Sequence, residues 1–158
     1  MNQRGIPEQA EFFMRRAIQE ARTAADQGEV PVGAVIAFGN RLVAAAHNMV
    51  EKLRDPTAHA EMIAITQAAA ALGDWRLEGT ALYVTKEPCL MCAGAIMLAR
   101  IPVVVWGVDD PSRGQGQSGS RVLQSEDLNH GCRIVRGILQ EDCRNLLQHF
   151  FQQIRRKK

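Results

Sequence analysis

The sequence predicts an α/β domain of three layers, in which helices cover both faces of a mixed β-sheet. Three observations support this prediction. Helical and strand-like apolar patterns alternate along the chain. Residues 81–106 have the pattern of strand, helix and strand, a unit that normally lays two parallel strands side by side. Two earlier strands are separated by a Gly-Asn pair suited to a tight antiparallel hairpin.

The N-terminal part of the chain is expected to form a helix and then this hairpin. Apolar residues recur at helical spacing over residues 7–26, and a glycine follows as a stop signal. The hairpin strands are expected over 32–38 and 42–46. They are joined through Gly39-Asn40, which can supply the positive φ that such turns require.

The rest of the chain is expected to alternate helices and strands around one long loop. A composition rich in Gly, Ser, Gln, Asp and Pro marks residues 109–120 as a surface loop and a candidate substrate rim. The closing helix carries an apolar stripe at 3-4 spacing. The expected elements are helices over 58–72, 88–99 and 143–154 and strands over 81–85, 103–106 and 132–135.

Length and composition fit one compact domain over residues 1–158. The chain is 46% hydrophobic, enough to bury a core without disulfides. A net charge of +2 does not by itself indicate a nucleic-acid partner, so any basic footprint is local. The clearest is the run from Arg155 to Lys158, although such runs are more often simply solvated. No segment resembles a signal peptide or membrane span, so we expect a cytoplasmic protein with no membrane partner.

Two short blocks carry the residues expected to perform chemistry. His59-Ala60-Glu61 lies in the first turn of the second helix, and Pro88-Cys89-Leu90-Met91-Cys92 opens the third with both cysteines on one face. One histidine and two cysteines can hold Zn²⁺ and leave its fourth position open for water, as catalytic zinc sites do. Glu61 is then available for proton transfer. His-x-Glu followed by Pro-Cys-x-x-Cys is the signature of zinc-dependent base deaminases, and both blocks match it in full.

Two other interpretations of these blocks stay open at this point. The zinc could be structural, with a further ligand closing the fourth position, or the Cys-x-x-Cys pair could serve redox chemistry. The redox interpretation leaves His59 and Glu61 unexplained. Two helix N-termini should lower the pKa values of Cys89 and Cys92, and two thiolates neutralise a dication, so metal binding is favoured.

The remaining cysteines and histidines have structural interpretations. Cys143 lies on the apolar stripe of the last helix and Cys132 at a strand edge, so both are expected in the core. His47 is expected to be structural and His149 to face solvent. For His130, a hydrogen bond that anchors the neighbouring loop competes evenly with a contact to a phosphate or base.

Several longer stretches extend the match beyond the two blocks and cover nearly the whole chain. They are Glu29–Val35, Asp55–Glu61, Leu82–Ile96, Ala99–Ile101, Trp106–Pro111, Asn129-His130 and Leu146–Phe151. Together they resemble the bacterial tRNA-specific adenosine deaminases, a family of cytidine-deaminase-like enzymes. The later stretches distinguish this family from the cytidine deaminases themselves.

The resemblance implies a cytidine-deaminase-like fold with a five-stranded mixed sheet, a homodimer, and hydrolytic deamination of adenosine to inosine at the wobble position of a tRNA anticodon. It implies one Zn²⁺ per subunit, held by His59, Cys89 and Cys92. Glu61 takes the place of the family's proton-transfer glutamate, and Asn48 that of its base-contacting asparagine. The implied partner is the anticodon stem-loop of a tRNA, with an arginine tRNA as the expected one.

Some residues named through the resemblance have other interpretations. Asn48 follows the second strand as an ordinary turn residue would. Asp110 matches a position near the bound nucleotide backbone or ribose, but it also fits simple turn chemistry. Phe150 and Phe151 resemble the family's aromatic pair beside the substrate loop, whereas their helical spacing favours core burial for at least one of them.

The chain departs from the family pattern in three places. Lys86 stands where the family usually has an apolar residue, Met49 follows Asn48 where a basic residue is common, and residues 116–119 vary a loop of small residues. These departures leave the expected chemistry intact. They bear on how RNA is held, because that depends on loops and surface charges.

Two further functions compete with tRNA editing. A deaminase of a free base or nucleoside, of guanine or cytosine type, would use the same chemistry, but its affinity would depend little on salt. An RNA-binding protein with a structural zinc would use Glu61 only as a helix-terminal charge. The near-continuous apolar stretch over 93–99 also predicts a dimer that buries part of this region and builds one site from both chains.

Overall fold

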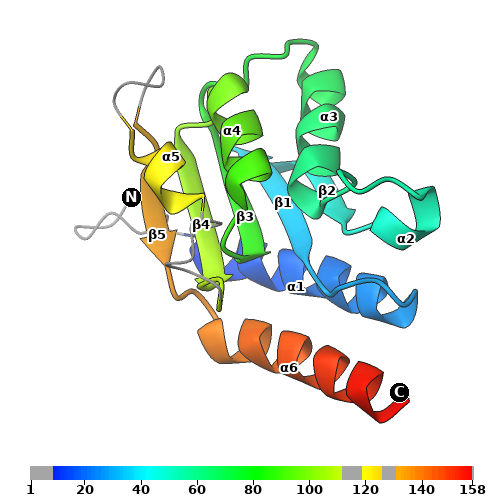
Figure 1. Ribbon diagram of the computed structural model, residues 1–158. Coiled ribbons are helices and arrows are strands. Elements are labelled where there is room, and N and C mark those ends of the chain that lie inside the picture. Colours follow the sequence, from blue (N-terminus) through cyan, green and yellow to red (C-terminus); the bar gives the residue numbers. More distant parts are fainter. Residues whose placement is uncertain (1–8, 112–118, 126–130, 158) are drawn as a thin grey trace.

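The computed structural model describes residues 9–111, 119–125 and 131–157, which form one mixed sheet with helices on both faces (Figure 1). The strands follow the order β2-β1-β3-β4-β5 across the sheet. They are β1 (Gly33–Phe38), β2 (Arg41–His47), β3 (Thr80–Lys86), β4 (Val103–Val108) and β5 (Arg133–Arg136). The helices are α1 (Ala10–Asp26), α2 (Val50–Leu53), α3 (Ala60–Leu72), α4 (Leu90–Leu98), α5 (Ser120–Leu123) and α6 (Gln140–Lys157). The predicted three-layer α/β class and five-stranded sheet are confirmed.

The strand pairings also agree with the sequence. β1 pairs antiparallel with β2 through the hairpin, where Gly39 has a φ of 60°. β1 pairs antiparallel with β3 on its other side, and β3, β4 and β5 are parallel. The α4 crossover between β3 and β4 therefore forms the expected strand–helix–strand unit, which ends both strands at the same edge of the sheet.

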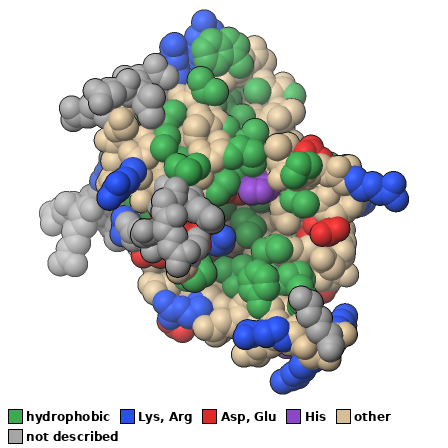
Figure 2. Space-filling model, viewed as in Figure 1, with side chains coloured by type: hydrophobic (Ala, Val, Ile, Leu, Met, Phe, Trp, Pro, Cys, Tyr) green, Lys and Arg blue, Asp and Glu red, His purple; other side chains and the backbone are tan. Residues whose placement is uncertain are grey.

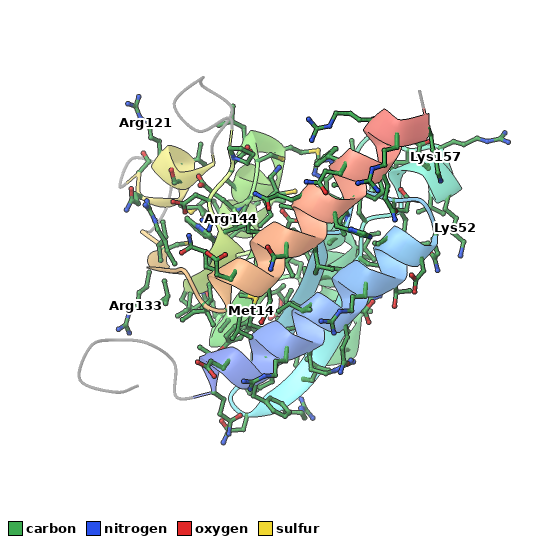
Figure 3. The ribbon with its side chains drawn as sticks, turned by 90° about the horizontal axis from the view of Figure 1, so that it is seen from below. Met14, Lys52, Arg121, Arg133, Arg144 and Lys157 are labelled. Carbon is green, nitrogen blue, oxygen red and sulfur yellow. The ribbon has the colours of Figure 1, made fainter. Side chains whose placement is uncertain are left out.

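Two apolar cores lie on opposite faces of the sheet. One lies between the sheet and the α3–α4 layer and includes Trp106 and Ile96, and the other lies under α1 and α6 and includes Phe13 and Met14. Seen from below, α1 and α6 lie side by side across the lower face (Figure 3). Within the described ranges, no helix has both the length and the apolar character needed to cross a bilayer.

Helix boundaries differ from the predicted ones at the N-terminal ends. The predicted starts at residues 58 and 88 are too early, because His59 and Cys89 have extended backbones and act as the N-cap residues of α3 and α4. The first helix begins at Ala10, and residues 1–8 lie outside the described part of the chain. α2 and α5 were not predicted, since four residues are too few to show a helical period.

The structural interpretations of the other cysteines and histidines hold. Cys132 and Cys143 are buried in the two cores. His47 links β2 to α1 through ring contacts with Glu20 at 2.9 Å and with a glutamine side chain at 3.2 Å. His149 is exposed on α6. His130 and residues 116–118 lie outside the described residues, whereas Gly119 is described and buried.

Candidate active site

The fold brings together the two sequence blocks at the N-termini of α3 and α4. Nδ1 of His59 lies 3.6 Å from Sγ of Cys89 and 3.4 Å from Sγ of Cys92. The three candidate ligand atoms all lie within 4.8 Å of one another. One imidazole nitrogen and two sulfurs are a donor set that zinc prefers, and a fourth protein ligand is absent from this cluster as far as the described residues go.

The backbone around Cys89 is held by an unusually close contact. The N–H of Gly119 donates to the carbonyl of Pro88 at 3.0 Å. A Cβ atom at Gly119 would lie 2.6 Å from the carbonyl oxygen of Cys89 and 2.6 Å from Cβ of Ala93. Both neighbours belong to the start of α4, so a side chain at Gly119 would push against the segment that carries the cysteines.

The cluster polarises its own thiols. A hydrogen bond from Cys92 lowers the pKa of Cys89 to about 3, so the Cys89 side chain is a thiolate at neutral pH. The same hydrogen bond, together with burial, raises the pKa of Cys92. Hydrogen bonding to Cys89 raises the pKa of His59. Thiolate is the form in which cysteine binds metal, so the cluster is prepared for a cation.

Glu61 lies in the first turn of α3, two residues after His59. Its side chain is buried, with 4% of its surface exposed, and it shares a pocket with His59 and Cys89. Burial raises the pKa of its carboxyl group, because a charged carboxylate is poorly solvated there. A carboxyl group with a raised pKa beside a cluster of candidate metal ligands is suited to taking up and releasing a proton.

The pocket has a volume of about 360 Å³ and joins segments far apart in the sequence. Its lining residues are Gly28, Glu29, Val30, Val32, Asn48, Val50, Glu51, His59, Ala60, Glu61, Lys86, Glu87, Cys89, Phe150, Phe151 and Ile154. Figure 2 shows hydrophobic side chains gathered around a histidine in the middle of one face, with basic side chains along the lower edge over α6. The volume suits a single base or nucleoside.

The aromatic pair of α6 forms part of this pocket rather than of the core. The helical spacing predicted core burial for at least one of the two, and this is wrong, since Phe150 is half-buried and Phe151 is exposed. Their rings meet edge to face at 5.4 Å. The apolar stripe of α6 packs on the sheet through Cys143, Leu146 and Leu147, and its C-terminal part turns to the pocket instead.

The two candidate substrate-binding residues are placed differently. Asn48 is buried and lines the pocket, and its backbone N–H donates to the carbonyl of Val32 at 3.1 Å. Asp110 is buried and does not line the pocket. Its carboxylate lies 3.6 Å from Nζ of Lys86, which does line it. The backbone N–H of Asp110 donates to Glu87 at 3.2 Å.

One buried group in the pocket wall was missed by the sequence analysis. Glu29 lies three residues after the end of α1, and its two carboxylate oxygens accept the backbone N–H groups of Glu51 at 3.0 Å and Lys52 at 2.8 Å. Glu29 therefore ties α2, which carries part of the pocket wall, to the end of α1. Nothing in the sequence indicates this contact, because α2 itself is too short to be predicted.

Known proteins have sequences similar to this chain along most of its length. Residues 7–108 match the family described as the cytidine and deoxycytidylate deaminase zinc-binding region. The chain is 47% identical to a tRNA-specific adenosine deaminase of Bacillus subtilis (strain 168), over 95% of this chain and 93% of the relative. It is 43% identical to a tRNA-specific adenosine deaminase of Aquifex aeolicus (strain VF5), over 92% of this chain and 95% of the relative.

Solved structures agree with the sequence comparison. A chain from a study of A-to-I editing by tRNA:A34 deaminases at the wobble position of transfer RNA has a TM-score of 0.80 and 41% identity, covering 86% of this chain and 99% of that chain. A guanine deaminase from Nitrosomonas europaea has a TM-score of 0.76 at 23% identity, which shows a shared fold. The predicted cytidine-deaminase-like fold and zinc-binding region are thus confirmed, and the chain belongs to the tRNA-specific adenosine deaminases of the cytidine and deoxycytidylate deaminase family.

Proposed function

We propose that this chain hydrolyses adenosine to inosine at the wobble position of a tRNA anticodon. The observation that carries the proposal is a buried glutamate, Glu61, in the same pocket as the His-Cys-Cys cluster. The deamination of adenosine in tRNA is taken from the relatives, which are named for it and align along most of both chains.

Zinc fits the residues that would hold it. His59, Cys89 and Cys92 supply one nitrogen and two sulfurs, and the low pKa of Cys89 provides a thiolate without an external base. Bound zinc supplies a water activated toward deprotonation near neutral pH. The remaining steps fall to side chains of the pocket.

Glu61 is proposed to move the protons of the reaction. Water adds to C6 of the adenine ring, the C6–N bond breaks, and ammonia leaves as inosine forms. Glu61 accepts a proton from the attacking water and returns it to the leaving amine, so the carboxyl group ends as it began. Burial raises its pKa, which makes the protonated form that donates to the leaving amine easier to reach.

The pocket wall is proposed to orient the base. The side-chain amide of Asn48 can both donate and accept, as an edge of the purine requires. Phe150 and Phe151 offer aromatic surfaces on which a base flipped out of the loop can stack. These contacts place C6 beside Glu61 and the metal ligands.

RNA binding is supported by exposed basic residues beside the pocket. Ile154 lines the pocket, and Arg155, Arg156 and Lys157 continue from it on the last turn of α6. Lys52 extends from α2, at the same end of the molecule as Lys157 (Figure 3). Phosphates of an anticodon stem-loop would be attracted to this end, and we propose an arginine tRNA as the partner.

A deamination assay tests the proposed function directly. The zinc-loaded protein is incubated with the anticodon stem-loop of an arginine tRNA carrying a wobble adenosine, with stem-loops of other tRNAs, and with free adenosine, cytidine and guanine. We expect inosine in the arginine stem-loop, at a rate that falls steeply with salt. Product from a free base or nucleoside alone, with little salt dependence, would overturn tRNA editing and leave the zinc chemistry standing.

We further propose a homodimer in the cytoplasm. α4 exposes Leu90 and Leu98, at 46% and 71% of their surface, and a second subunit would cover this apolar face and complete the RNA site. Sedimentation at micromolar concentration tests the dimer, and a monomer would contradict it. A reducing compartment suits the four free cysteines and the tRNA substrate, and fractionation of cells would check this location.

A further inference from the structure

The pocket wall and the proposed RNA substrate both carry acidic groups. Four glutamates line the pocket, Glu29, Glu51, Glu61 and Glu87. Among the residues that the structure describes, Lys86 is the single lysine or arginine in the lining. A polyanionic RNA that delivers a nucleoside into this pocket therefore meets repulsion from the charged carboxylates of the wall and attraction at Lys86.

Lys86 is placed so that its charge is available at the pocket. It is the last residue of β3, and its side chain is 29% exposed. Its ammonium group lies 3.6 Å from the Asp110 carboxylate, which is longer than the roughly 2.7–2.9 Å of a charge-assisted hydrogen bond. An ammonium group has three donors, so this partner orients the group and leaves donors for a ligand.

Asp110 is itself fixed and can hold the lysine in place. It is buried, and its backbone N–H donates to Glu87, the residue that follows Lys86. The backbone N–H of Glu87 in turn donates to the carbonyl of Val108 at 2.9 Å. The ends of β3 and β4 are thus locked together, and the Lys86–Asp110 pair spans them.

Lys86 also lies close to the reacting end of the pocket. It lines the same pocket as His59, Glu61 and Cys89, and it stands three residues before Cys89 in the chain. A group that the Lys86 ammonium binds is therefore near the metal ligands. In an RNA strand, the anionic groups nearest to a target base are the phosphodiesters on either side of its nucleoside.

We propose that Lys86 is a substrate-binding residue that contacts a phosphodiester flanking the target nucleoside, and that Asp110 is the positioning residue that holds its ammonium group. The inference rests on the proposed function, because it needs an RNA substrate. It also gives Asp110 a place near the nucleotide backbone, with Lys86 between the two.

The test compares wild type with Lys86→Met, Lys86→Arg and a control, Arg15→Met, which removes an exposed charge on α1. Each protein is assayed on the unmodified stem-loop and on stem-loops with a neutral methylphosphonate 5′ or 3′ of the wobble adenosine. We expect Lys86→Met to lower kcat/KM about tenfold, mainly through KM, and to reduce the salt slope by about 0.7. Lys86→Arg should keep the slope, and Arg15→Met should match wild type.

One of the two methylphosphonates should remove most of the difference in kcat/KM between wild type and Lys86→Met. Losing the lysine and losing the phosphate charge both remove the same contact, so their effects should not add. The proposal is overturned if the salt slope of Lys86→Met equals that of wild type, or if both methylphosphonates leave the tenfold difference in place. Zinc content and melting temperature identify a variant that has lost its fold. If Lys86→Met is such a variant, the salt slope of Lys86→Arg decides whether the proposal stands. If wild type binds the stem-loop without deaminating it, the proposed function fails, and binding constants measured by anisotropy still test the phosphate contact. No binding at all overturns both.

Discussion

The pocket joins two regions that are built in different ways. At one end of the pocket, here called the metal end, the candidate ligands lie at the N-termini of α3 and α4. The inner faces of these two helices pack in the core through Ala64, Ala93 and Ile96. The outer wall comes from α2, which has no buried residue, and from α6, whose one buried residue is Cys143. The residues that perform the chemistry are thus positioned by helices packed in the core. Substrate contacts come from exposed helices, where substitutions cost the fold little stability.

This difference predicts two kinds of variant. A change at the metal end should remove turnover, because geometry there is fixed by the core and each group has a separate task. A change at the outer wall should alter binding of the substrate more than the rate of the chemical step.

Loss of a metal ligand should have the largest effect. Cys92→Ala removes one of the two sulfurs, and we expect the zinc content to fall and deamination to drop to the uncatalysed background. Cys143→Ala is the matched control, since it makes the same change at another buried cysteine. It should keep zinc and turnover and lose about 1 kcal/mol of stability. Full activity of Cys92→Ala without bound zinc would show that turnover does not depend on this metal site.

Loss of the proton-transfer group should follow. Glu61→Gln keeps the shape of the buried side chain but cannot accept the proton, so we expect kcat to fall by about 10² to 10⁴ while zinc stays bound. Metal analysis and single-turnover kinetics measure the two quantities. Glu78→Gln, on an exposed side chain, is the control. Unchanged turnover in Glu61→Gln would remove the proton-transfer role of this glutamate.

The metal end was also the part that the sequence could predict. His59, Glu61, Cys89 and Cys92 are fixed by chemistry, and their short spacings within each block survive any error in helix boundaries. The structure brings the two blocks together because β2 and β3 are both antiparallel to β1, so the segments that follow these two strands start from the same edge of the sheet. The exact N-cap positions of His59 and Cys89 were not predicted, since an extended residue and a first-turn residue look alike in a periodic pattern.

Two features of the outer wall could not be predicted from the sequence, namely the face that α6 turns to the pocket and the contact that holds α2. Helical spacing shows which residues of α6 share a face, but it does not show whether that face meets the sheet or a pocket. At least one of Phe150 and Phe151 was therefore expected in the core, whereas both line the pocket. The contact of Glu29 with α2 joins two segments through side chain and backbone, and it leaves no mark on composition or period. Such contacts depend on tertiary packing alone.

Loosening α2 should have an intermediate effect. Glu29→Gln replaces one acceptor oxygen with an NH₂ group that faces a backbone N–H, so the α2 segment loses one of its two anchors. We expect faster hydrogen exchange over residues 48–54 and a KM for the stem-loop raised about tenfold, with zinc retained. Glu11→Gln, the same change on the exposed face of α1, is the control. Exchange equal to that of wild type would show that α2 is held by other contacts.

Removing the exposed aromatic ring of α6 should have the smallest effect on activity. It also compares most directly a pocket residue with a core residue. Phe151 is 45% exposed, so Phe151→Ala should change the free energy of unfolding by only about 0.5 kcal/mol and raise KM a few-fold through the lost stacking surface. Phe13→Ala is the matched comparison, since that ring is fully buried under α1 and its loss should cost about 3–5 kcal/mol. Chemical denaturation and steady-state kinetics measure both. A large loss of stability in Phe151→Ala would mean that the outer wall is part of the core after all, because an exposed ring that only contacts substrate contributes little to folding.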